Sequence, residues 1–233
     1  WMFNQYRYRK GTVLMILRCR FTKLGDIAYI SHLDLLKIFI RALRRSMIEV
    51  NYSEGFHPHP KISFSSALSL GIESYAEFID IDIKNSEDSI NFLQRMNESL
   101  PEGIDIIECK ETEKAEPLTK TMSHSLYEIY FDSDNDGISD AIAQVMKSEE
   151  LMLKKRNKKK QIKDVNVREK IHSIEYDPEK NIIKTILTNS SEGALKPTDM
   201  LKAINENFGK EFNPYRIVKI ASIMIADDII NII

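Results

Sequence analysis

The stretch SHLDLLKIFIRALRRSMIEVNYSEGFHPHPKISF, residues 31–64, decides how the first half of the chain is interpreted. Ser31 is a favourable helix N-cap, and Asp34 lies three residues on, near the spacing of a capping box. Apolar residues then recur every three or four positions, which predicts an amphipathic helix with one buried face. They are Leu33, Leu36, Phe39, Ile40, Leu43 and Met47.

Outward from this helix, the pattern predicts the order strand, helix, strand, strand, helix, strand. The further elements are strands at residues 15–23, 62–70, 76–84 and 104–109 and a helix at residues 87–100. This order is that of a split βαβ, ferredoxin-like domain. Right-handed crossovers would then place the last strand beside the first.

The neighbouring strands make two expectations about side chains. Cys19 and Cys109 should lie on adjacent strands, and since they are the only cysteines, we expect two reduced, buried thiols in a cytoplasmic protein. Alternation also puts Arg18 and Arg20 on the open face of the sheet, near Asp80 and Asp82. That face would be self-neutralised, so an anion-binding surface is expected on the helix and loop instead.

The second half repeats the pattern less regularly. Strands are expected at residues 125–131, 151–156, 165–176, 181–189 and 216–226, with helices at 138–147 and 197–208. The predicted fold class is therefore α+β, with two ferredoxin-like (split βαβ) lobes and antiparallel sheets. Its parts are an N-terminal extension (1–14), a first lobe (15–110), a linker (111–122) and a second lobe (123–233).

Composition narrows the class of protein. Hydrophobic residues make up 42% of the chain and charged residues 29%, which is ordinary for a globular protein. No apolar run approaches the roughly 18 residues of a membrane span, and the N-terminus lacks the apolar core of a signal peptide. Residues 1–62 carry 11 Lys and Arg against 4 Asp and Glu, so the basic block contains the decisive stretch. We therefore expect no membrane association and an anionic partner.

The basic side of the first helix is the main candidate for phosphate binding. Its cations are Lys37, Arg41, Arg44 and Arg45, and Lys61 follows in the loop. No acidic residue lies between positions 35 and 48 to neutralise them. The loop that would contact a substrate or partner contains Tyr52, Glu54, Gly55, Phe56, His57 and His59. Tyr52 and Phe56 suit either base stacking or packing on the core.

Two other segments allow alternatives. The run KKRNKKKQIK, residues 154–163, suits a β-hairpin arm on nucleic acid or a solvated loop. DSDNDG at residues 132–137 resembles a calcium loop, but Ala143 stands where an EF-hand needs Glu, which favours an acidic turn.

A catalytic alternative rests on histidines. The prolines around His57 and His59 would present both imidazoles rigidly, and His32 is a third imidazole close in sequence. Such a set could hold Zn, Mn or Fe, or act as acid and base in a nuclease or metal-dependent hydrolase. No recognised ligand spacing is met, so no cofactor is expected, and enzyme activity is left open.

Several runs together resemble the radical-SAM-linked protein family of bacteria. They are FTKLGDIAYISHLDL (21–35), RALRR (41–45), YSEGFHPHPKISF (52–64), LSLGIES (68–74), EFIDI (77–81) and KPTDML (196–201). The resemblance implies an accessory subunit, binding tRNA, rRNA or a partner protein, for a radical SAM modification enzyme. The chain has no C-x-x-x-C-x-x-C motif to hold the iron–sulfur cluster itself. A protein–protein adaptor that does not bind RNA is a further alternative.

Overall fold

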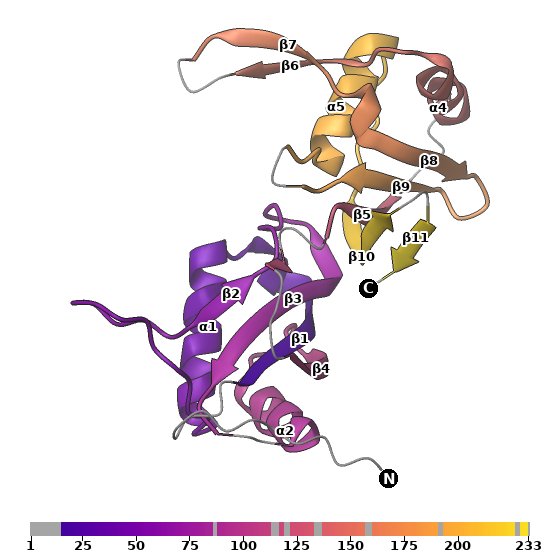
Figure 1. Cartoon of the computed structure of the whole chain (residues 1–233). Helices are drawn as coiled ribbons and strands as arrows, with labels where there is room; N and C mark the ends of the chain where they lie inside the picture. Colours follow the sequence, from indigo (N-terminus) through magenta and orange to yellow (C-terminus); the bar gives the residue numbers. More distant parts are fainter. Residues whose placement is uncertain are drawn as a thin grey trace. The chain divides into compact units, whose positions relative to one another are not determined.

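A computed structural model describes residues 15–85, 88–112, 117–118, 122–132, 137–156, 160–190, 193–226 and 229–232, with side chains as far as Ile223. The fold is mixed α+β and its strands are mostly antiparallel, as predicted. The chain divides into two compact units, one of residues 1–67 with 77–118 and one of residues 68–76 with 119–233 (Figure 1). The predicted N-terminal extension and most of the predicted linker lie outside the described residues.

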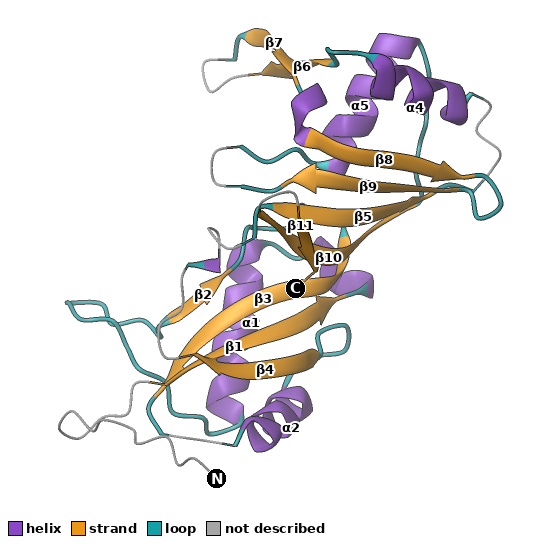
Figure 2. Ribbon diagram, turned by 45° about the vertical axis from the view of Figure 1, so that its right-hand side comes forward, coloured by secondary structure: helices purple, strands orange, loops and turns teal. Residues whose placement is uncertain are grey.

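The first unit has the predicted order of elements. They are β1 (Met15–Lys23), α1 (His32–Arg45), β2 (Ile62–Phe64), β3 (Glu73–Ile83), α2 (Ser89–Ser99) and β4 (Ile106–Thr112), with a short 3₁₀ turn, η1 (Gly25–Tyr29), before α1. Strand β1 lies between β4 and β3, and β2 pairs with β3 (Figure 2). The backbone N–H of Asp34 donates to the Ser31 hydroxyl, which confirms the predicted N-cap.

The core of the first unit lies between the sheet and the two helices, with three phenylalanines in contact at its centre. The ring of Phe39 meets the rings of Phe21 at 4.9 Å and Phe64 at 5.5 Å, both edge to face. Leu35, Phe39, Ala42 and Leu43 form the buried side of α1. Phe21 and Phe39 are fully buried and Phe64 is partly buried against them, so these edge-to-face contacts contribute to the packing of the unit.

The predicted buried face of the first helix was wrong at both ends. Leu33 is 67% exposed and Met47 is 83% exposed. Leu33 lies in the first turn of α1, while Met47 lies beyond the last helical residue, Arg45, with a positive φ of 53°. The helical period therefore does not apply at Met47. Leu35 and Ala42 are buried instead, although neither belonged to the predicted apolar face.

Cys19 and Cys109 are joined by a disulfide, so the prediction of two reduced thiols was wrong. Their placement on neighbouring strands is confirmed, because β1 pairs with β4 in antiparallel register with Cys19 opposite Cys109. Their Cα atoms are 4.1 Å apart. Directly opposed residues at this separation bring their sulfurs within bonding distance. The prediction of reduced thiols was based on the number of cysteines, which says nothing about this geometry.

The predicted charge pairing across the sheet is half right. The Arg18 guanidinium binds both carboxylate oxygens of Asp80, at 2.8 and 2.9 Å. Arg20 lies 3.9 Å from Glu108 on β4 rather than near Asp82. Asp82 instead accepts a hydrogen bond from the side-chain amide of Asn51. The face is therefore self-neutralised as expected, but with one partner exchanged.

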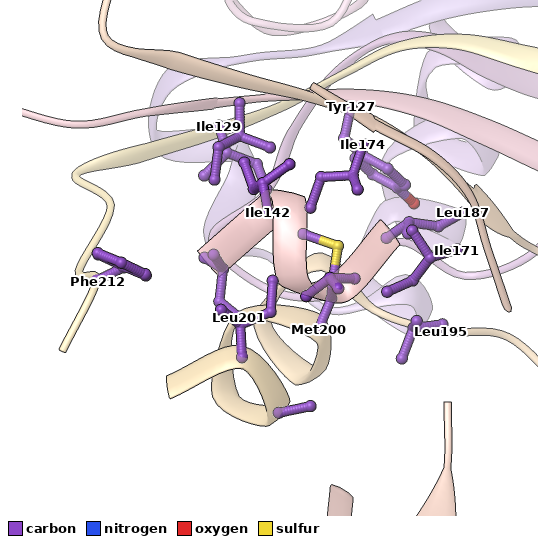
Figure 3. Close-up of a cluster of buried hydrophobic side chains, with 14 of the residues drawn as sticks. Tyr127, Ile129, Ile142, Ile171, Ile174, Leu187, Leu195, Met200, Leu201 and Phe212 are labelled. Atoms are coloured by element: carbon purple, nitrogen blue, oxygen red, sulfur yellow. The ribbon is translucent and has the colours of Figure 1, made fainter. Parts of the chain in front are cut away.

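The described residues of the second unit form two helices and the remaining strands. They are β5 (His124–Tyr130), α4 (Ile138–Lys147), β6 (Met152–Arg156), β7 (Ile162–Asn166), β8 (Ile171–Asp177), β9 (Ile182–Thr188), α5 (Pro197–Phe208), β10 (Arg216–Ala226) and β11 (Ile229–Ile232). The sheet order is β10-β5-β9-β8, with β11 added on β10. Helices α4 and α5 supply Ile142, Met200 and Leu201 to the core on this sheet (Figure 3).

Two boundaries differ from prediction. The strand expected at 165–176 is two strands, β7 and β8, separated by the 3₁₀ turn η2 (Arg168–Lys170), and β7 forms a separate hairpin with β6. Residues 68–76, assigned from sequence to the first lobe, pack with the second unit. Ile72 belongs to the second core, and Glu73 pairs with Val218 of β10 in parallel.

Among the described residues, no helix is long and apolar enough to cross a bilayer.

His124 of β5 is a residue through which we expect acid to destabilise the second unit. Its ring lies 5.6 Å from that of His172, and burial, followed by repulsion from His172, lowers the pKa of His124 below its ordinary 6.5. In the unfolded chain His124 titrates near its ordinary pKa, so it binds a proton at a higher pH than in the folded protein. The free energy of unfolding therefore decreases as the pH falls through 6.5 and below. We expect a His124→Gln variant to lose less stability than wild type between about pH 7.5 and pH 5.5.

The midpoint of urea unfolding, recorded at both pH values, measures this difference. Equal losses in the two proteins would show that His124 does not contribute to acid sensitivity.

Candidate functional site

The basic side of α1 is exposed, but its four cations are not equivalent. Lys37 forms an ion pair with Asp34 at 3.0 Å, and Arg45 donates to the carbonyl oxygen of Ser99. Arg41 and Arg44 form no ion pair within the described part of the chain. A hydrogen bond from Ser31, and then one from Lys37, lower the pKa of Asp34. Arg41 and Arg44 are thus the cations most open to an added anion.

The loop after α1 is a hairpin-like arm, defined here as residues 51–61, that projects beyond β2 (Figures 1 and 2). Its two sides are joined by backbone hydrogen bonds from Lys61 to Asn51 and from Ser53 to His59. Between them, Tyr52 and Pro60 form a bridge. The arm is therefore a paired structure and not an irregular connection.

The base of the arm is fixed to β3. Backbone hydrogen bonds run from Asn51 to Asp82 and from Asp82 to Lys61, at 2.8 and 3.0 Å. The Asn51 side chain also donates to the Asp82 carboxylate at 2.7 Å, and Lys61 lies 3.8 Å from it. Lys61 is consequently engaged with an acid on its own sheet, which lowers its value as a phosphate contact.

The tip of the arm is open to solvent. Phe56 is fully exposed, which excludes packing on the core as its role in this structure, and Glu54, Gly55, His57 and Pro58 are exposed beside it. Gly55 has a φ of +126°, a conformation that favours glycine. Below the tip, the Ser53 hydroxyl lies 2.9 Å from Nδ1 of His59. The tip thus exposes the Phe56 ring to solvent, while the contact between Ser53 and His59 holds the part of the arm below it.

A pocket of about 190 Å³ lies between α1 and the base of the arm. Ile40, Leu43, Ile48 and Val50 supply its apolar part, Tyr52 and Pro60 line it from the arm, and Arg44, Glu49 and Lys84 supply charge. Tyr52 is 42% exposed, so one part of its surface is available to a ligand. Apolar surface, an aromatic ring and cations are the elements of a site for a planar ring carrying negative charge.

Comparison with known families places the chain. Residues 17–197 match the model of a family described as "Uncharacterized protein conserved in bacteria (DUF2344)". The chain belongs to the DUF2344 family. A comparison with curated proteins gave no match. The matched segment includes the basic helix, the arm and the pocket of this DUF2344 protein. The family description names no activity, so the link to radical SAM enzymes stays a prediction.

The three candidate histidines of this DUF2344 protein do not form one group. The His32 ring packs on Phe64 at 5.1 Å, His59 is held by Ser53, and His57 lies at the exposed tip of the arm. Within the part of the chain that the structure describes, no three His, Cys, Asp or Glu side chains gather in a way that could hold a metal ion. The catalytic alternative therefore has no assembled metal site among these residues.

Sequence reasoning missed part of the pocket. Glu49 and Lys84 line it, yet neither was a candidate. They meet because Val50 bridges Ile83 and the backbone N–H of Lys84 donates to the carbonyl of Glu49 at 2.9 Å. The only sequence signal that could have found them is the extended pairing of residues 49–51 with residues 82–84 at the end of β3, which a separation of more than 30 positions hides.

Proposed function

We propose that this DUF2344 protein is an accessory RNA-binding subunit that holds single-stranded RNA against the first unit. The observation that carries the proposal is the pocket, where the half-exposed ring of Tyr52 adjoins Arg44 and Lys84. Neither cation forms an ion pair within the described residues. A base stacked on Tyr52 would place its phosphate within reach of these two cations.

The balance of interactions favours single strands over duplexes. Stacking of a base on an aromatic side chain contributes about 1–3 kcal/mol, and it requires an unpaired base with an open face. Arg41 continues the positive surface along α1 beyond the pocket. Together these groups suit a short stretch of RNA with one base in the pocket and neighbouring phosphates on the helix.

The resemblance to radical-SAM-linked proteins supports the nature of the partner. In this proposal, the RNA is tRNA or rRNA, and a separate radical SAM enzyme modifies it. The order β4-β1-β3, with β2 on β3, supports a ferredoxin-like assignment for the first unit. Phe56 at the tip of the arm is a suitable contact for the enzyme partner because it is fully exposed and not involved in the core.

A salt series with a fluorescent single-stranded RNA tests the proposal. Affinity is expected to fall linearly on a log–log plot, with a slope near −0.7 for each phosphate contact. Arg41, Arg44 and Lys84 predict about three contacts, and so a slope near −2. Fluorescence anisotropy at about 50–200 mM salt measures it. Absence of binding at the lowest salt would overturn the proposal and leave the protein–protein adaptor.

A further inference from the structure

Glu49 is unexpected on a surface for phosphates. It lines the same pocket as Arg44 and Lys84 but forms an ion pair with neither, within the described residues. Oε2 of the Glu49 carboxylate accepts a hydrogen bond from the Asn85 amide at 3.4 Å, the outer limit of a hydrogen bond. A carboxylate here repels phosphate. A ligand that binds in this pocket must therefore donate hydrogen bonds to Glu49, which offset that repulsion.

The backbone holds Glu49 firmly. The N–H of Ile48 donates to the carbonyl of Leu43 at 3.0 Å, and the carbonyl of Glu49 accepts from Lys84 at 2.9 Å. Val50 then bridges Ile83. Since its backbone is fixed on both sides, Glu49 lines the pocket by construction of the sheet edge and not by chance of a mobile loop.

The three charged side chains of the pocket limit the chemical class of ligand that it can bind. An arginine from a partner protein could stack on Tyr52 and pair with Glu49, but Arg44 and Lys84 line the same pocket and would repel it. A ligand that satisfies all three charges carries two neighbouring donors for the carboxylate and acceptors for the cations. Among the four RNA bases, guanine alone presents two adjacent donors, N1–H and N2–H, beside the acceptor O6.

We propose that this pocket selects an unpaired guanine in the RNA. Its ring stacks on Tyr52, and its Watson–Crick donors bind the Glu49 carboxylate. Arg44 and Lys84 each bind an adjoining phosphate, and Arg44 also donates to O6. The volume of about 190 Å³ is below the roughly 300 Å³ of sites that enclose whole small molecules, which suits one base and not a complete dinucleotide. The inference rests on the proposed RNA binding and adds its base specificity.

Four oligouridines that differ only in the central nucleotide, G, A, C or U, test this selection by competition in fluorescence anisotropy. The G-containing strand is expected to bind about tenfold more tightly than the others, the discrimination of one good bidentate contact. A Glu49→Gln variant should reduce this ratio to below about threefold, because the amide offers one acceptor in place of two.

Glu102→Gln is the matched control, since it removes the same charge from an exposed position of the first unit outside both the pocket and the arm. It should keep the full preference for G, so that a change in general phosphate affinity is not mistaken for lost selection. Equal affinity of wild type for all four strands would overturn the guanine assignment while leaving RNA binding intact. Failure to bind any strand at low salt would overturn both.

Discussion

Replacement of Phe39 by alanine is expected to lower the free energy of unfolding of the first unit by about 3–5 kcal/mol. The side chain has no exposed surface, and its ring contacts Phe21 and Phe64. The loss combines the transfer energy of the ring with the cavity left among side chains that cannot close over it. Because domains are stable by only about 5–15 kcal/mol, this variant should unfold at much lower urea, as followed by far-UV circular dichroism.

Leu33→Ala is the control from the same helix. Leu33 is 67% exposed, so its truncation should change stability by no more than about 0.5 kcal/mol. The pair also decides between the two buried faces of α1. A loss at Leu33 as large as that at Phe39 would support the face expected from apolar periodicity and contradict the observed one.

Reversal of three charges, Arg41→Glu, Arg44→Glu and Lys84→Glu together, is expected to weaken single-stranded RNA binding about a hundredfold near 0.1 M salt. Each cation that releases a counterion contributes about 0.7 to the log–log slope, so the slope should fall by about two. Fluorescence anisotropy across the salt series gives both quantities. All three residues are exposed, and the fold should therefore survive the change.

A matched variant reverses Lys180, Lys196 and Lys202 in the second unit, which are also exposed. It has the same total charge as the test variant and should keep a slope within about half of one contact of wild type. If both variants lose affinity equally, the binding reflects net charge alone, and the assignment of RNA to α1 and the pocket is wrong.

The order of elements in the first unit could be predicted because each element carries its own local signal. The Ser31 cap and the spacing of Phe39 and Leu43 mark α1, and strict alternation marks β1. The ends were less predictable. The helical pattern of apolar residues continues through Met47, but the chain takes a left-handed conformation there. In the folded protein Ala42 is buried and the larger Leu33 is exposed.

The candidate site divides along the same line. Arg44 and Tyr52 were predictable, since they belong to a basic helix face and a contact-rich loop. Glu49 and Lys84 were not, because their place in the pocket depends on strand pairing between distant segments. The disulfide of Cys19 was missed for a related reason. Its partner follows from antiparallel register, whereas the prediction of reduced thiols came from the number of cysteines.

The closed base of the arm makes its outer end exchangeable. The backbone hydrogen bond from Ser53 to His59 closes the hairpin below residues 54–58. An insertion or deletion within residues 54–58 therefore leaves unchanged both the pairing of the arm with β3 and the position of Tyr52 in the pocket. Lengthening such a loop is cheap, at about 0.6 kcal/mol for each doubling. Relatives could therefore diversify the end of the arm to suit different partners without redesigning the pocket, and an affinity tag or fluorophore could be grafted at the same place.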